Sequence, residues 1–96
     1  MAKIYIDDVG TKFIIDTGVD LTNATVTKLK LKKPDGSIVE WVASIEGDAK
    51  NGKISYATQA GDINLAGVWQ LQSYIEFSYL KYNGETVNFI VYEQWK

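Results

Sequence analysis

Apolar and polar residues alternate along much of this chain, so that every second side chain is apolar. The alternation covers residues 25–31 and resumes at residues 39–45, on either side of Pro34-Asp35-Gly36. A period of two residues is typical of a β-strand that buries one face. A helical period of 3.6 residues is not sustained beyond one turn in any segment. The pattern therefore predicts an all-β fold.

Turn-forming residues divide this pattern into seven predicted strands, a number that suits a two-sheet sandwich. We expect the strands at about residues 2–6, 11–16, 24–33, 38–46, 53–58, 68–81 and 85–95, within one domain that spans residues 1–96. A single helical turn is expected near residues 62–66, with Asp62 as its N-cap.

The length of its loop determines the register of the first hairpin. If Pro34-Asp35-Gly36 is a three-residue loop with Gly36 in the left-handed conformation, the apolar residues of both strands face the same way. A two-residue loop would place them on opposite faces. The expected pairs are Leu31 with Val39, Leu29 with Trp41 and Thr27 with Ala43.

The second hairpin is expected around Tyr82-Asn83-Gly84. Asn-Gly is typical of a two-residue hairpin loop, but the apolar faces match only if this loop also has three residues. On the outer face, Tyr74 then lies opposite Tyr92, Ile90 opposite Glu76, and Gln72 opposite Gln94. On the inner face, the expected pairs are Phe77 with Phe89, Ile75 with Val91, Tyr79 with Val87 and Leu71 with Trp95.

Composition excludes several classes of chemistry. The chain has no cysteine and no histidine, which removes disulfides, thiol catalysis and Ser-His mechanisms. All ten basic residues are lysine and the formal net charge is −2, so nucleic acid is disfavoured as a partner. No apolar run is long enough for a membrane span or a signal peptide. We expect no catalytic residues, no cofactor and no membrane association.

Acidic residues suggest two other sites, and neither has a diagnostic spacing. Asp7, Asp8, Asp16 and Asp20 offer the oxygen ligands that Ca²⁺ prefers, but they form no recognisable metal-binding loop. Turn formation is their default interpretation. The glutamates fall on different predicted strands, which disfavours a converging pair for glycoside hydrolysis. We therefore expect no metal site.

The layout of the predicted core resembles an immunoglobulin domain. Trp41 lies opposite Leu29, and Leu71 follows a turn-rich segment that ends in Val68-Trp69-Gln70. In this resemblance Leu29 and Leu71 take the positions of the bridging cysteines, and Trp41 takes that of the core tryptophan. Trp69 takes the position of the corner tyrosine, from which its indole N–H would donate backward to the main chain. The expected fold is an immunoglobulin-like antiparallel β-sandwich of about seven strands without a disulfide.

Seven short motifs, spread over nearly the whole chain, carry a closer resemblance. They lie at residues 11–13, 20–25, 33–37, 52–56, 61–63, 66–72 and 87–91. Together they resemble the immunoglobulin-like N-terminal domain of the baseplate upper proteins of tailed phages and prophages of Gram-positive bacteria. The resemblance implies a non-enzymatic structural or attachment component of the phage tail tip. It also implies a place in the virion after assembly in the host cytoplasm, contacts with other tail and baseplate proteins, and a homo-oligomer in the assembly.

The outer face of the last hairpin is the predicted contact surface. Tyr74, Ile90 and Tyr92 point outward there, and flat aromatic rings contribute contact area at low entropic cost. Protein–protein contact is the first interpretation of this face. The alternative is a carbohydrate-binding module that recognises a bacterial surface glycan, and ordinary surface exposure is the third. The lysines at positions 28, 30 and 32 are interpreted as a solvated strand face.

Overall fold

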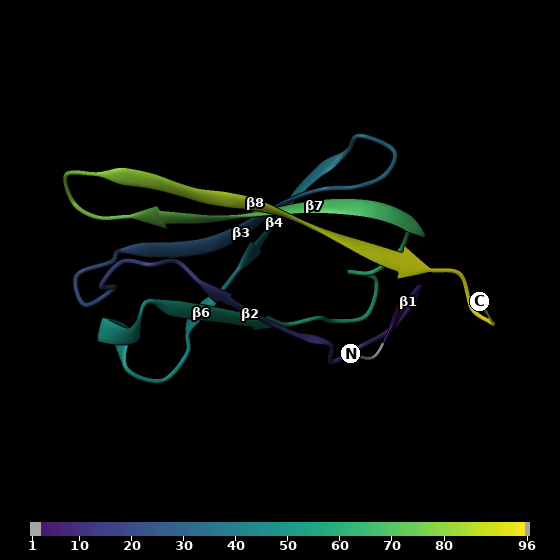
Figure 1. The fold of residues 1–96 in the computed structure, drawn as a ribbon, viewed down its shortest axis with the longest axis horizontal. Coiled ribbons are helices and arrows are strands. Elements are labelled where there is room, and N and C mark those ends of the chain that lie inside the picture. Colours follow the sequence, from purple (N-terminus) through teal and green to yellow (C-terminus); the bar gives the residue numbers. More distant parts are fainter. Residues whose placement is uncertain (1–2, 96) are drawn as a thin grey trace.

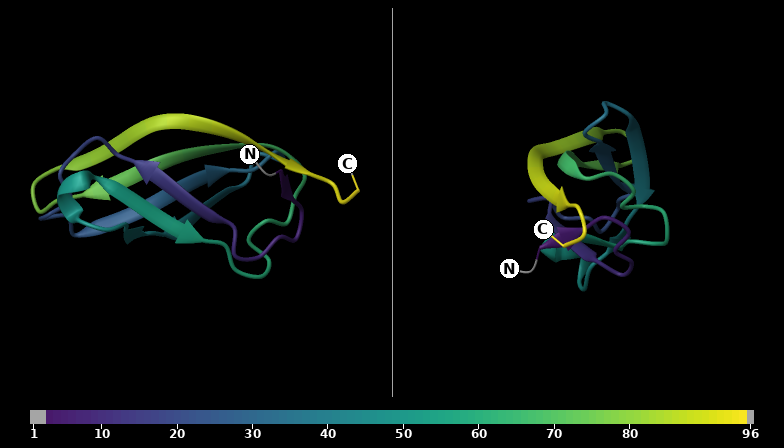
Figure 2. Two further views of the ribbon diagram at one scale, coloured as in Figure 1. Left: turned by 60° about the horizontal axis from the view of Figure 1, so that its bottom comes forward. Right: turned by 90° about the vertical axis from the view of Figure 1, so that its right-hand side faces the viewer.

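Two layers of strands face each other across a core of aromatic and aliphatic side chains (Figures 1 and 2). This arrangement comes from a computed structural model, which describes residues 3–95. The strands are β1 (Ile4–Tyr5), β2 (Lys12–Asp16), β3 (Val26–Lys32), β4 (Ile38–Val42), β5 (Ser44–Ile45), β6 (Lys53–Ala57), β7 (Gly67–Glu76) and β8 (Lys81–Tyr92), and one 3₁₀ turn, η1, spans Ala49–Asn51.

The order of the strands is that of an immunoglobulin-like sandwich. One sheet has the order β1-β8-β7-β3-β4, and the other has the order β2-β6-β5. In immunoglobulin lettering, β2, β6 and β5 correspond to strands B, E and D, whereas β8, β7 and β3 correspond to G, F and C. The larger sheet is mixed, because β1 pairs with β8 in parallel. The prediction of a purely antiparallel sandwich is wrong at this one ladder.

The first hairpin has the predicted register. Leu29 lies opposite Trp41, and Leu31 lies opposite Val39. Gly36 has a φ of 88°, which is the left-handed conformation that the three-residue loop requires. The main-chain N–H of Ala43 donates to the carbonyl oxygen of Thr27 over 3.0 Å, so the predicted pairing of these two residues is also confirmed.

The segment predicted as one strand at residues 38–46 is two strands in different sheets. Up to Val42 it pairs with β3, and from Ser44 onward it pairs with β6. The crossing takes place at Ala43, whose small side chain is buried between the layers. Residues 3–95 therefore form eight strands instead of the seven predicted, and this continuous segment joins the two sheets covalently.

The second hairpin has a different turn from the predicted one. Its chain reverses at Ser78-Tyr79, where the N–H of Phe77 donates to the carbonyl oxygen of Leu80 over 2.7 Å. Tyr82-Asn83-Gly84 lies inside β8, next to a bulge opposite Ser73. The predicted opposition of Tyr74 and Tyr92 is wrong, as are the other pairs of that register. The observed partners are Asn83 for Tyr74, Val68 for Ile90, Trp69 for Phe89, Val87 for Leu71, Tyr82 for Ile75 and Thr86 for Gln72.

Aromatic rings from both sheets form the centre of the core. Trp41 stacks on Tyr56 of the opposite sheet, with ring centroids 4.8 Å apart, and Phe13 contacts Phe89 across the layers at 5.0 Å. Trp69 stacks on Phe89 at 5.7 Å and is fully buried. Aromatic pairs at these separations add to the free energy gained by burying their area.

Leu29 and Leu71 do not bridge the two sheets. Both are fully buried, but β3 and β7 are neighbours in the same sheet, where Leu31 lies opposite Leu71. The bridging positions of an immunoglobulin domain lie on strands of different sheets. The analogy in which Leu29 and Leu71 replace that disulfide is therefore wrong, because β3 is the third strand of the fold and not the second.

Trp69 makes the predicted corner hydrogen bond, but the predicted helical turn beside it is absent. The indole N–H of Trp69 donates to the carbonyl oxygen of Leu65 over 3.0 Å. Residues 62–66 form no helix, and the 3₁₀ turn lies at η1 instead. The carboxylate of Asp62 accepts hydrogen bonds from the Tyr56 hydroxyl and the Gln59 N–H, at 2.6 and 2.7 Å. Asp62 thus closes a turn that precedes it.

Candidate interaction surface

The outer face of the five-stranded sheet carries the three residues that the sequence singles out. Tyr74 lies on β7, and Ile90 and Tyr92 lie on β8, with all three on the face opposite the buried side chains of these strands. Ile90 is paired with Val68, six residues before Tyr74 on the same strand. At about 3.3 Å per residue, Tyr74 is therefore about 20 Å from the Val68–Ile90 pair. Tyr74 therefore shares a face with Ile90 and Tyr92 but lies far from both.

Tyr74 is surrounded by polar groups. Its hydroxyl donates to a carboxylate oxygen of Glu76 over 3.0 Å, and the Lys30 ammonium lies 4.2 Å from its ring centroid. Partial burial raises the pKa of Tyr74, and the hydrogen bond to Glu76 raises it further. The phenol is therefore a neutral donor whose hydroxyl and one ring face are already in use.

Ile90, Val68 and Tyr92 form the apolar part of the outer face. Ile90 and Val68 are 49% and 53% exposed, and they lie directly opposite each other on β8 and β7. Two residues further along β8, Tyr92 packs against Tyr5 of β1, with ring centroids 6.2 Å apart. The Lys3 ammonium lies 4.7 Å from the Tyr92 ring centroid. We call Val68, Ile90, Tyr92 and Tyr5 the outer patch.

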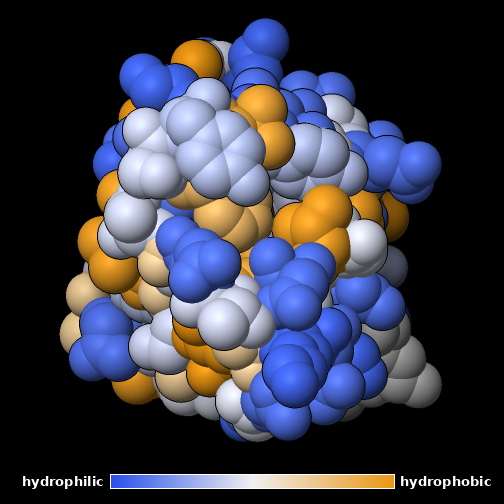
Figure 3. All heavy atoms as spheres, turned by 90° about the vertical axis from the view of Figure 1, so that its left-hand side faces the viewer, coloured by the Kyte–Doolittle hydropathy of each residue, from blue (hydrophilic) through white to orange (hydrophobic). Residues whose placement is uncertain are grey.

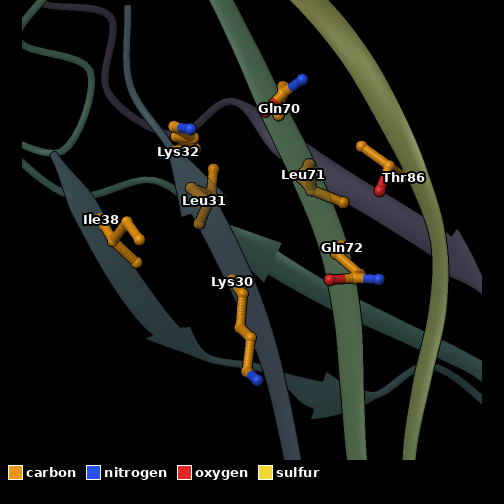
Figure 4. Close-up of a pocket in the computed structure, with 8 residues that line it drawn as sticks. All are labelled: Lys30, Leu31, Lys32, Ile38, Gln70, Leu71, Gln72 and Thr86. Atoms are coloured by element: carbon orange, nitrogen blue, oxygen red, sulfur yellow. The ribbon is translucent and has the colours of Figure 1, made fainter. Parts of the chain in front are cut away.

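A shallow depression lies beside the outer patch on the same face (Figure 4). Its polar rim comes from Lys30 and Lys32 on β3 and from Gln70 and Gln72 on β7 (Figure 4). The Gln72 amide donates to the carbonyl oxygen of Gly84 over 2.8 Å. The depression has a volume of about 220 Å³, and Leu31, Ile38, Leu71 and Thr86 line it together with these lysines and amides.

The tip of the second hairpin is an exposed apolar feature that the sequence interpretation missed. Tyr79 is 85% exposed and Leu80 is 49% exposed, and the ring of Tyr79 stacks on Phe77. From this end of the molecule, hydrophobic side chains are scattered among hydrophilic ones (Figure 3). The sequence interpretation missed the tip because Ser78-Tyr79 contains no glycine, asparagine or proline, whereas Asn83-Gly84 nearby gives a stronger turn signal.

Three of the four aspartates considered for calcium accept hydrogen bonds from main-chain N–H groups near them in the chain. Asp8 accepts from the N–H of Tyr5, Asp16 from that of Gly18, and Asp20 from that of Thr22, at 2.9, 3.0 and 2.9 Å. The Thr22 hydroxyl also donates to the Asp20 carboxylate. The two hydrogen bonds from Thr22 lower the pKa of Asp20, and the bond from the hydroxyl has the larger effect. Within residues 3–95, no three acidic side chains are grouped so that they could hold a metal ion.

No helix in the described part of the chain has the length and hydropathy needed to cross a bilayer.

Comparison with known proteins identifies the family of the chain. No curated protein matches the sequence. Residues 14–93 match the family described as the BppU N-terminal domain. This range begins inside β2 and runs past the end of β8, so it includes strands of both sheets. The chain belongs to this family, the N-terminal domain of baseplate upper proteins, and is a phage baseplate domain.

Proposed function

We propose that this domain is a non-enzymatic structural component of the phage tail tip, and that it works through protein–protein contacts. Membership of the baseplate family is the observation that supports this most strongly. In this proposal the domain binds other tail proteins, becomes part of the virion after assembly in the host cytoplasm, and belongs to a homo-oligomer or a larger assembly.

The outer patch is the contact surface that we propose. Val68 and Ile90 present adjoining aliphatic groups on a strand pair, and Tyr92 and Tyr5 add aromatic area beside them. Such a surface of a few hundred Å² is within the range that monomers tolerate, so each contact is weak by itself. Repetition of the contact in an assembly strengthens it through avidity. We therefore expect the isolated domain to be monomeric at micromolar concentration.

We rank carbohydrate binding second because a lysine ammonium group lies over the ring of each of the two tyrosines, Tyr74 and Tyr92. A sugar platform needs an open ring face, but the Lys30 and Lys3 ammonium groups lie over the rings of Tyr74 and Tyr92. Binding on a glycan array that is lost in both Tyr74→Ala and Tyr92→Ala would support this second function and count against the first.

The test of the proposed function is co-assembly with the other tail proteins of the same phage, followed by mass measurement of the complex. Val68→Glu places a charge in the outer patch without altering the core, and we expect it to prevent assembly. Val42→Glu is the matched control, because Val42 is also an exposed valine on the outer face of this sheet, 75% exposed, at its far edge.

Two results would contradict the proposal. If the wild-type domain does not co-purify with any tail protein, the structural role fails. If Val42→Glu prevents assembly whereas Val68→Glu does not, the contact lies on the side of the face near Lys28 and the outer patch is the wrong surface.

A further inference from the structure

The side of the sandwich between β2 and β8 is open. Within residues 3–95 both are edge strands along most of their length, because β2 pairs only with β6 and β8 meets β1 only at Val91 and Tyr92. A groove of about 550 Å³ runs between them. A second depression of about 390 Å³ continues this groove toward the bulge and shares Ile15 and Val87 with it.

The edge of β8 that borders this groove presents main-chain N–H and C=O groups that can form hydrogen bonds. The N–H of Ile6 donates to the carbonyl oxygen of Tyr92, so the main-chain groups of Tyr92 point away from β7. Main-chain direction alternates along a strand, and the groups of Thr86, Asn88 and Ile90 therefore point to the same side. Within the described chain, no strand pairs with them there.

The usual protection against edge pairing is missing from this stretch. Natural edge strands carry lysine, proline or a bulge, or they are very short. Residues 86–90 read Thr-Val-Asn-Phe-Ile, with no charge and no proline, and the bulge lies before them. The other edge strands are protected, because β1 and β5 have two residues each, β4 carries Glu40, and β2 carries Lys12 and Asp16 at its ends.

The floor and the ends of the groove specify its occupant. Phe13 and Phe89 line it together with the half-exposed Ile14 and Val87, so side chains that enter it must be apolar. Lys3 lies at the end next to β1. Asp16 and Glu85 lie at the end next to the bulge.

Lys12 also lines the groove, but its ammonium is paired with Glu46 at 2.7 Å. Lys3 is therefore the cation that faces an incoming segment at this end.

We propose that an extended segment of a partner protein adds as a strand to the edge of β8 at residues 86–90. Its alternate side chains are apolar and enter the groove, with an acidic residue at the Lys3 end and a basic residue at the Glu85 end. Strand addition of this kind derives affinity from main-chain hydrogen bonds and specificity from the alternate side chains. The proposal rests on the proposed function and names the kind of partner segment involved.

A second copy of β8 does not suit this edge. An antiparallel copy centred on Asn88 would continue for twelve residues along the same line, and β1 already occupies that line at Val91 and Tyr92. The free stretch accepts about five residues, or about 17 Å of extended chain. The edge therefore favours a short segment.

The probe is a capped nine-residue peptide in which valine and threonine alternate between an N-terminal aspartate and a C-terminal lysine. Its reversed sequence covers the parallel direction. On saturation with at least one of them, we expect amide exchange at Thr86, Asn88 and Ile90 to slow by about tenfold, as for other newly paired strands. Replacing the aspartate of the bound peptide by lysine, or its lysine by aspartate, should weaken its binding. Equal binding after either replacement would overturn the assignment of charges.

Two variants test the edge itself. Val87→Glu places a charge in the groove, and Asn88→Pro removes an N–H that points to the free edge without breaking the β7 ladder. Both should lose the protection of Thr86 and Ile90, whereas Val42→Glu should keep it. Unchanged exchange in the wild type with both peptides overturns the proposal. A peptide-free dimer that Val87→Glu dissociates would also overturn it, because a second copy would then be the occupant.

The assembly assay separates this proposal from the proposed function. If Val87→Glu and Asn88→Pro co-assemble normally with the tail proteins while Val68→Glu does not, the strand-addition proposal fails and the structural role stands. If the peptides protect the edge but no tail protein binds the wild-type domain, the structural role fails.

Discussion

Single side chains in the aromatic core should dominate the stability of the domain. Trp41 is 6% exposed, stacks on Tyr56 of the opposite sheet and also contacts Phe13. We expect Trp41→Ala to lower the free energy of unfolding by about 3–5 kcal/mol, through lost burial and the cavity left behind. Urea titration measures this change, and the neighbouring exposed residue provides a control, since Val42→Ala should cost less than about 0.5 kcal/mol. A loss below about 1 kcal/mol for Trp41→Ala would show that this residue is not central to the core.

Tyr56 should make the free energy of unfolding of the domain fall at alkaline pH. Burial raises the pKa of this phenol from 10.0 to about 12, and the hydrogen bond to Asp62 contributes to the rise. The folded state therefore favours the protonated phenol, and its contribution is complete below pH 10 and is lost as the pH rises toward about 12.

Tyr56→Phe should consequently reduce the fall in the free energy of unfolding between pH 10 and pH 12, as measured by urea titration at several pH values. Part of the fall should persist, because the pKa of Tyr74 is raised as well. An identical fall in the wild type and in Tyr56→Phe would remove Tyr56 as its cause.

At the scale of elements, one glycine fixes how the end of β2 meets the start of β6. Gly52 has a φ of 73°, and its carbonyl oxygen accepts hydrogen bonds from both the N–H and the hydroxyl of Thr17. A Cβ added there would lie 2.4 Å from the carbonyl oxygen of Val19, a main-chain atom that cannot rotate away. Gly47 has a similar φ of 67° with no atom within 4 Å of such a Cβ.

Gly52→Ala should therefore destabilise the domain by about 1–3 kcal/mol more than Gly47→Ala, because both carry the left-handed strain and only the first adds a clash. Thermal unfolding of the two variants measures the difference. Equal destabilisation would mean that the loop around Val19 moves freely enough to accept a side chain.

The two hairpins show how much of the fold the sequence pattern can predict. In the first, the loop Pro34-Asp35-Gly36 and the alternation agree on one register, and Trp41 therefore lies opposite Leu29 as predicted. In the second, Phe89 and Val91 do face the core, but their partners on β7 are Trp69 and Gly67, which lie eight residues further from the turn than the predicted partners. Side chains repeat their face every two residues, so the pattern does not distinguish registers that differ by an even number of positions.

The candidate surface was also only partly predictable from the sequence pattern. The alternation correctly places Tyr74, Ile90 and Tyr92 outward, but their mutual distances depend on the register and were not accessible from the pattern. The open groove was not predictable either, because it depends on which strand edges lack a partner. That property belongs to the assembled sheets, in which β1 covers only Val91 and Tyr92 of the β8 edge.

The whole molecule should unfold in one step. The strand that crosses at Ala43 joins the sheets covalently, and the ring contacts of Trp41 and Phe13 join them through the core. No sheet has a separate core that would survive the loss of the other. We expect the far-ultraviolet circular dichroism and the tryptophan fluorescence to change at the same urea concentration, which is the test of two-state behaviour for a small domain. Separate midpoints would show that one sheet melts first.

The parallel pairing of β1 with β8 also determines how the domain responds to mechanical force. The chain enters through β1 and leaves through β8, and these two strands lie side by side with the same direction (Figure 1). A pull that separates the two ends of the chain therefore slides one strand along the other, and loads the ladder at Val91 and Tyr92 and the Ile6 hydrogen bond together. An antiparallel terminal pair pulled from one side would open one bond at a time. We therefore expect this short ladder to bear tension before the rest of the fold does when the two ends of the chain are pulled apart.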